Sequence, residues 1–200
     1  QLLKLIERGQ TRAEARKMGS ERDIYLWVSL MLYLGSDFDT DPQFPAIQAA
    51  LAGNAPPPER LDAAYDVATA YLNQVAGPDG QNASAAATRF QRAAYELDRL
   101  VQRPLRDSLS WVYPQRFAAL SSEQIDAIGR VGQRLALDHS FERQRGALLC
   151  SILALLLGHG FASDPQLPWA AQTLSKLTGA DPLRRTLQFR DAAAAGVSRW

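Results

Sequence analysis

Apolar residues recur every three to four positions along most of the chain, which is the spacing of helices with one buried face. Residues 57–75 are a clear case, with Leu61, Ala64, Tyr65, Val67, Ala68 and Tyr71 at helical spacing. No stretch alternates between apolar and polar residues as a half-buried strand does. We therefore predict an all-α protein of about nine helices and no sheet. Six helices are expected at about 2–18, 21–34, 57–75, 83–103, 122–139 and 142–157, and three more after the Asp-Pro pairs at 41, 164 and 181.

The pattern of the first quarter of the chain returns in its second half. The segments LGSDFDTDPQFP at 34–45 and LGHGFASDPQLP at 157–168 lie 123 residues apart. An ungapped comparison of 9–51 with 132–174 at this offset gives 15 identities in 43 positions. Such self-similarity is the mark of a repeat architecture. We predict a tandem repeat of two diverged helical units, the first with its connecting helix at 1–104 and the second at 105–200.

Each unit carries the residues that begin and end helices. A glycine follows the apolar helix, where only glycine enters a positive φ without strain, and we expect it to be the helix C-cap. An Asp-Pro pair follows, in which the carboxylate is expected to cap the next helix and the proline to lie in its first turn. The predicted structural residues are Gly35, Asp41 and Pro42 in the first unit and Gly158, Asp164 and Pro165 in the second. Tyr25, Trp27 and Tyr33 lie in an apolar helix and are expected in the core.

Composition narrows the range of partners. The 22 Lys and Arg residues nearly balance the 21 Asp and Glu residues, for a net charge of +1. This balance does not favour nucleic acid or an anionic membrane as a direct partner. The longest apolar run, at 147–157, has 11 residues, against roughly 20 for a membrane span. Its Cys150 is the only cysteine and is expected to be a buried thiol. We predict a cytoplasmic protein without a membrane partner.

The acidic run Asp37, Asp39 and Asp41 is the sharpest chemical feature, because carboxylates at this spacing begin a calcium-binding EF-hand loop. The rest of that loop is missing, since Pro42 stands where glycine is required and Gln48 stands where a bidentate glutamate belongs. We therefore favour helix capping over a metal site. The histidines at 139 and 159 have no zinc-site spacing, and the sequence holds no Gly-x-Ser-x-Gly or phosphate-binding glycine loop. We predict no enzyme activity, no cofactor and no metal; acid–base catalysis by a histidine stays the alternative.

The order of these motifs resembles a family. The segments ERDI at 21–24 and LGSDFDTDP at 34–42, with LG at 157–158 and DPQLPWA at 164–170, are similar to those of an uncharacterised helical-repeat family with the motif LGxDFDTDPxxP. That family is associated with bacterial type VI secretion gene clusters. The resemblance covers about 1–53 and 114–178. The chain departs from the pattern at Ala46, where the family has tryptophan, and at Gly160 and Ala162, which lack the acids.

The resemblance implies a protein that works beside secreted toxins. Our first expectation is an immunity protein that binds a type VI effector toxin, such as a nuclease, and occludes its active site. The alternative is an adaptor or chaperone that loads an effector onto the secretion spike. Acidic loops suit a basic nuclease cleft, so we expect the partner contacts at Asp37, Asp39, His159 and Trp169.

Overall fold

The computed structural model describes residues 1–177, 179 and 181–198. Within these ranges it is 78% helical with no strand, which confirms the all-α prediction. The first part of the chain forms α1 (Leu2–Glu14), α2 (Glu21–Leu34), the 3-10 turn η1 (Phe38–Thr40), α3 (Pro45–Ala52) and α4 (Pro57–Ala76). The last part forms α9 (Ser122–Asp138), α10 (Arg143–Leu157), η3 (Phe161–Ser163), α11 (Pro168–Lys176) and α12 (Pro182–Val197).

A connecting segment joins these two parts. It comprises η2 (Pro78–Gly80), α5 (Gln81–Tyr95), α6 (Leu97–Leu100), α7 (Leu105–Val112) and α8 (Pro114–Ala118). The described residues thus hold twelve α-helices, against the nine predicted. The excess arises here, because short helices follow Glu96, Pro104 and Tyr113 where one long helix and a loop were expected.

Several helix ends follow the predicted local chemistry. Gly35 and Gly158 are the C-caps of α2 and α10, with φ of 97° and 92°, which only glycine adopts without strain. The Asp181 carboxylate accepts the backbone N–H of Leu183 at 3.0 Å and caps α12. These three residues act as the sequence predicted.

The capping role predicted for Asp41 and Asp164 is wrong. The helices that follow begin later, at Pro45 in α3 and at Pro168 in α11, and neither has a side-chain cap. The reason is an extra backbone turn, in which the residue before each helix donates to the carbonyl of the aspartate. A second proline then takes the first helical position, so Pro42 and Pro165 lie outside the helices.

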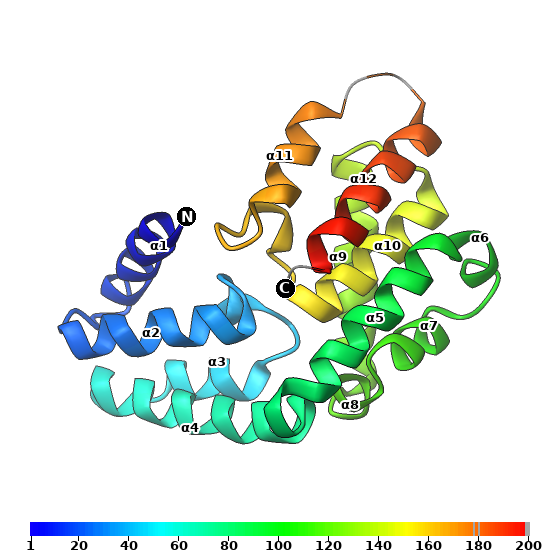
Figure 1. Ribbon diagram of the computed structural model, residues 1–200. Coiled ribbons are helices and arrows are strands. Elements are labelled where there is room, and N and C mark those ends of the chain that lie inside the picture. The colour runs from blue at the N-terminus through cyan, green and yellow to red at the C-terminus, as the bar shows by residue number, and fades with distance from the viewer. Residues whose placement is uncertain (178, 180, 199–200) are drawn as a thin grey trace.

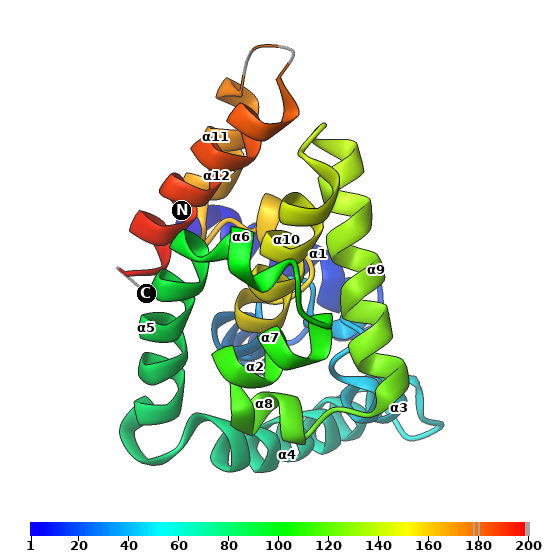
Figure 2. The same ribbon diagram turned by 90° about the vertical axis from the view of Figure 1, so that its right-hand side faces the viewer.

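The buried side chains form two clusters. The first comes from α1 to α4 and includes Trp27, Phe38 and Leu61. The second begins at Ala86 in α5 and extends to the last helix. Figure 1 shows the corresponding arrangement, with α1 to α4 on one side and α9 to α12 on the other, and in Figure 2 α5, α6 and α7 lie along α10. The core therefore divides between α4 and α5, whereas the predicted division lies after residue 104.

Glycines allow close helix packing at two corresponding positions. A Cβ at Gly132 in α9 would lie 2.5 Å from the carbonyl oxygen of Ala147 in α10 and would also collide with Ser151. A Cβ at Gly9 in α1 would lie 2.7 Å from the side chain of Val28 in α2. Each amphipathic first helix is thereby held tightly against the apolar helix that follows it.

Candidate functional site

The two motif loops, 35–44 and 158–167, meet near the centre of the molecule. The Asp41 carboxylate accepts the backbone N–H of His159 at 2.7 Å, and the Asp164 carboxylate accepts the backbone N–H of Ser36 at 2.8 Å. These two bonds correspond to each other at an offset of 123 residues. Each aspartate also accepts the N–H of the glutamine two residues later, at 2.9 and 2.8 Å. The Asp-Pro aspartates thus join the loops to each other.

The glutamines and glycines of the loops repeat this reciprocity. The side chain of Gln43 donates to the carbonyl of Ala154 at 2.9 Å, and that of Gln166 donates to the carbonyl of Met31 at 2.8 Å. A Cβ at Gly35 would lie 2.8 Å from the carbonyl oxygen of Leu157. Side chains at the two glycines would therefore separate the loops.

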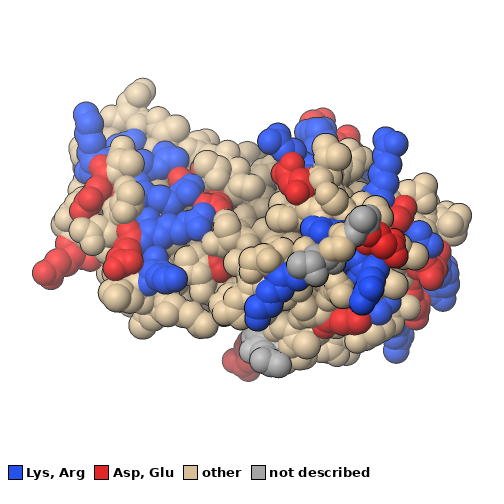
Figure 3. Space-filling model, turned by 90° about the horizontal axis from the view of Figure 1, so that it is seen from above, with Lys and Arg blue, Asp and Glu red and all other residues tan. Residues whose placement is uncertain are grey.

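Three arginines from α1 and the turn that follows it hold the acidic part of the first loop. Arg8 and Arg12 lie one turn apart in α1, and Arg16 lies just after the helix ends. Asp37 pairs with Arg8 at 2.6 Å and with Arg12 at 2.7 Å. Asp39 pairs with Arg12 and, at 3.0 Å, with Arg16. Figure 3 shows Lys and Arg side chains next to Asp and Glu side chains over the part of the molecule that contains α1. Asp37 and Asp39 are neutralised within the chain, so a partner would have to displace these arginines to use them.

The second half lacks these ion pairs, because it has neither the corresponding arginines on its first helix nor the corresponding aspartates on its loop. At the offset of 123, the three arginine positions hold Val131, Leu135 and His139. The two aspartate positions hold Gly160 and Ala162. Val131, Leu135 and Ala162 pack against the second core. The charged residues that form ion pairs in the first half are thus matched, at both the helix and the loop positions, by residues that include apolar side chains packed against the core in the second half.

The predicted contact residue His159 lies where the loops meet. Its Nδ1 is 3.3 Å from a carboxylate oxygen of Asp41, and its side chain is 25% exposed. Burial alone would lower the pKa of His159, but the negative charge of Asp41 beside the ring, helped by Asp37, outweighs burial and raises it. Protonated His159 therefore strengthens the contact between the loops.

Trp169 lies apart from the other three predicted contact residues. Its ring centroid is 6.0 Å from that of Phe189, and it packs closely over Gly196 in α12. Its indole Nε1 is buried without a partner among the described residues. The structure therefore gathers Asp37, Asp39 and His159 around the loops, while Trp169 joins α11 to α12. Their role as partner contacts stays a prediction.

Two tyrosines expected in the core lie on the surface. Tyr25 is 72% exposed and Tyr33 is 62% exposed, whereas Trp27 is fully buried as predicted. Helix α2 buries the face that carries Trp27, Leu30, Met31 and Leu34. The opposite face carries Tyr25, Ser29, Leu32 and Tyr33, and we call these four residues the α2 face. Ser29 was the one sequence signal that this side is not core.

The counterpart of the α2 face on α10 is covered. Leu148, Ile152, Leu155 and Leu156 stand at the same positions with the offset of 123, and all four are buried. Helix α10 packs against α5, α6 and α7 on this side, whereas the main neighbours of α2 are α1 and α4. The difference in exposure therefore comes from the connecting segment, which covers only one of the two helices.

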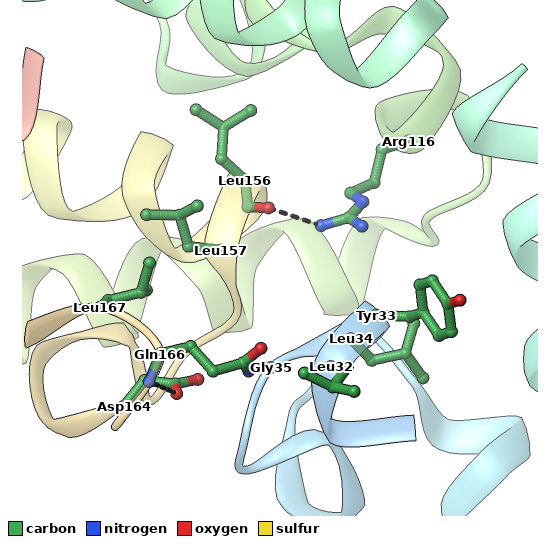
Figure 4. Close-up of a pocket in the computed structure, with 10 residues that line it drawn as sticks. All are labelled: Leu32, Tyr33, Leu34, Gly35, Arg116, Leu156, Leu157, Asp164, Gln166 and Leu167. Carbon is green, nitrogen blue, oxygen red and sulfur yellow. Dashed lines mark hydrogen bonds between the residues drawn. The ribbon is translucent and has the colours of Figure 1, made fainter. Parts of the chain in front are cut away.

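A small pocket lies between the C-terminal ends of α2 and α10 (Figure 4). Arg116 of α8 is 4% exposed and donates to the carbonyls of Leu155 and Leu156 at 2.7 and 3.1 Å. Its guanidinium carbon lies 5.1 Å from the ring centre of Tyr113, and among the described residues no carboxylate pairs with it. The pocket volume of about 10 Å³ admits roughly one water-sized group. It is therefore too small to be a site for an organic ligand.

The other reactive groups are embedded in the fold. Burial raises the pKa of the Cys150 thiol to about 12, and burial lowers the pKa of His139. In the described ranges, no three His, Cys, Asp or Glu side chains are grouped so that they could hold a metal ion. Over the same ranges, none of the helices is long and apolar enough to cross a membrane.

Comparison of the chain with protein-family models, with curated proteins and with solved structures finds no match.

Proposed function

We propose that this protein acts by stoichiometric binding to a partner protein, and that the α2 face is its primary contact. The observation that carries the proposal is the pair of exposed tyrosines at 25 and 33 beside Leu32, which is 45% exposed. Tyrosine contributes a large apolar area and a hydroxyl that is satisfied by water in the free protein and by a polar group in a complex. Tyrosine is also enriched among the residues that dominate binding energy.

We infer that the two halves are diverged copies of one unit. Support comes from the 15 identities at one offset and from the hydrogen bonds of the loops, which occur in corresponding pairs. The turns η1 and η3 and the starts of α3 and α11 also differ by 123 residues. This equivalence makes the covered face of α10 a guide to what an occupied α2 face would be like.

The partner we propose first is a type VI effector toxin, with this protein as its immunity protein. The support is the resemblance of the LGSDFDTDP motif to a family of those gene clusters. The second candidate is an adaptor that loads an effector onto the secretion spike. We propose the α2 face as the first contact in preference to Asp37 and Asp39, because those two carboxylates are already paired with arginines.

Co-expression with the product of the adjacent toxin gene tests this proposal. We expect a stable complex and rescue of growth by the wild-type protein. The double substitution Tyr25→Asp with Tyr33→Asp should abolish both, since each residue of this kind contributes about 2 kcal/mol or more, or roughly 30-fold in affinity. The matched control is Tyr95→Asp, because Tyr95 is equally exposed, at 64%, but lies on α5.

The outcomes separate the candidates. A complex with rescue supports immunity. A complex without rescue, together with loss of effector secretion when the gene is deleted, supports the adaptor. Absence of a complex, or a complex that the α2-face variant leaves unchanged, contradicts the proposed binding surface.

A further inference from the structure

We infer that the α2 face binds one amphipathic helix of the partner, which lies on α2 as the connecting segment lies on α10. This inference rests on the proposed function and on the equivalence of α2 and α10. It names the kind of structure that the partner presents, which the proposed function leaves open.

The covered helix shows what such an occupant looks like. The side of α10 that carries Leu148 and Ile152 belongs to the same buried cluster as the inner faces of α5, α6 and α7. Helix α5 contributes one large residue, Phe90, beside the small residues Ala93 and Ala94. Small residues let helix backbones approach closely, and a large side chain then fills the groove between ridges. A partner helix with this alternation would fit the α2 face.

The α2 face differs from its counterpart in a way that suits a separable partner. Leu148, Ile152 and Leu156 of α10 are replaced by Tyr25, Ser29 and Tyr33. A permanently covered face needs no polar atoms, whereas a face that is free before binding benefits from hydroxyls that water can satisfy. The occupant should therefore flank its apolar stripe with hydrogen-bond acceptors for the two tyrosine hydroxyls.

The size of the face selects a single helix over a second copy of the chain. The four residues span two turns of α2, or about 12 Å. A stable dimer buries roughly 800 Å² on each subunit, from about 20 to 30 residues. One helix that crosses two or three turns of α2 matches this small face better than a whole subunit does.

At the C-terminal end of the α2 face, the partner helix should also supply a hydrogen-bond donor. Arg116 donates to the carbonyls of Leu155 and Leu156 at the end of α10. The corresponding carbonyls of α2, at Leu32 and Tyr33, receive no side-chain donor from the described residues, and both residues line the pocket of Figure 4. Arg116 forms another wall of that pocket, so a second cation would be repelled. We expect the partner helix to present a neutral donor here, such as an amide or a hydroxyl.

Site-specific crosslinking of the complex tests the inference. A photoreactive phenylalanine analogue replaces Tyr25, Tyr33 or, as control, Tyr95, in the full chain co-expressed with the adjacent toxin gene product. We expect crosslinks from 25 and 33, but not from 95, to one helical segment of the partner with apolar residues three to four apart. A synthetic peptide of that segment should bind the wild-type protein, and Tyr33→Ala should weaken it about 30-fold while Tyr95→Ala leaves it unchanged.

Other outcomes overturn the inference in distinguishable ways. Crosslinks from 25 and 33 to a strand or an extended loop would refute a helical occupant but keep the proposed function. Crosslinks to a second copy of the chain, with a dimer by sedimentation, would replace the partner with self-association. A complex that crosslinks only from 95 would place the contact elsewhere. Failure to form any complex would remove both the inference and the proposed function.

Discussion

The aspartates of the two loops show that the same Asp-Pro pair can form either a helix cap or a contact between distant loops. Asp-Pro before an apolar helix is a sound cap signal, and at Asp181 it forms a cap. At Asp41 and Asp164 the same pair is followed by a second proline three residues later, which delays the helix. The carboxylates are then free to reach the opposite loop. Sequence alone identified these residues as structural, but their acceptor role depends on a contact between segments 123 residues apart.

Replacing Asp164 by alanine should destabilise the protein by about 3 kcal/mol, more than a lost cap would. The change leaves the buried Ser36 N–H, the Ser36 hydroxyl and the Gln166 N–H without their acceptor, and each unsatisfied buried donor costs about 1–3 kcal/mol. Urea unfolding followed by circular dichroism measures the loss. As control, Asp191→Ala removes an exposed carboxylate and should change stability by less than about 0.5 kcal/mol. A loss at Asp164 as small as that of the control would contradict this role.

His159 should make the stability of the protein depend on pH. Its pKa is raised in the folded state above the unfolded value of about 6.5. Its contribution is therefore fully present below that unfolded value and is lost as the pH rises through the folded pKa. The difference in unfolding free energy between wild type and His159→Gln should shrink as the pH is raised from about 5.5 to about 9.

The second histidine provides the opposite control for that experiment. Burial lowers the pKa of His139 in the folded state. The wild type should therefore lose stability relative to His139→Gln as the pH falls below about 6.5. If the difference in unfolding free energy from wild type changed with pH in the same direction for both variants, the opposite pKa shifts of the two histidines would be contradicted.

At the scale of helices, periodicity located α2 and α10 but did not show what covers them. Both were expected to be buried because both are apolar. Every residue of α10 from Leu148 to Leu157 is buried, whereas Tyr25, Leu32 and Tyr33 of α2 are exposed. The reason is that α5, α6 and α7 fold back onto α10. On this face the only hint in the sequence is that α2 has Tyr25, Ser29 and Tyr33 where α10 has Leu148, Ile152 and Leu156. Which helices cover α10 depends on contacts with the connecting segment, which the sequence of α10 does not reveal.

The glycines that hold each helix pair should respond differently to alanine. At Gly132 the new Cβ would collide with Ser151 and with the Ala147 carbonyl, which is backbone and cannot move freely. We expect Gly132→Ala to cost about 3 kcal/mol through overpacking. At Gly9 the nearest atoms, Val28 Cγ2 and Met31 Sδ, belong to side chains and not to backbone. Gly9→Ala should therefore cost less than Gly132→Ala, because a side chain shifts more easily than backbone and alanine also gains about 1 kcal/mol in helix propensity.

Thermal unfolding of the two glycine variants checks this expectation. The melting temperature of Gly132→Ala should fall by several degrees more than that of Gly9→Ala. Equal shifts would mean that the backbone contact between α9 and α10 relaxes as easily as a side-chain contact.

At the scale of the whole molecule, two cores are joined by polar contacts. The loops exchange hydrogen bonds, Arg8 donates to the carbonyl of Ser163 at 3.2 Å, and Gln124 of α9 donates to the carbonyl of Gln43 at 3.0 Å. The sequence predicted the helical class from periodicity and the similarity of the loops from their identities. It could not predict that the loops bind each other, because the glycine and the Asp-Pro pair of each loop could be explained by helix ends within the same unit.

We expect these contacts to make the two cores unfold together. Hydrogen exchange should show α2 and α10 losing protection at the same urea concentration in the wild type. Gly35→Val introduces a side chain at a φ of 97° and against the carbonyl of Leu157, which should separate the loops. In that variant α1 to α4 should open first, because the described residues of their core include 14 buried apolar side chains against 30 in the other. Simultaneous opening in the variant would show that other contacts couple the cores.

The reciprocal loops also impose an order on biosynthesis. Asp41 is translated about 120 residues before the backbone of His159 that it binds. At about 5–20 residues per second, the ribosome needs roughly 6 to 25 s to deliver that partner. During this interval Arg8, Arg12 and Arg16 can already pair with Asp37 and Asp39, since all five residues have been translated. In the nascent first half the acidic loop is therefore already held in place, while the Asp41 carboxylate remains hydrated until the second loop has been synthesised and binds it.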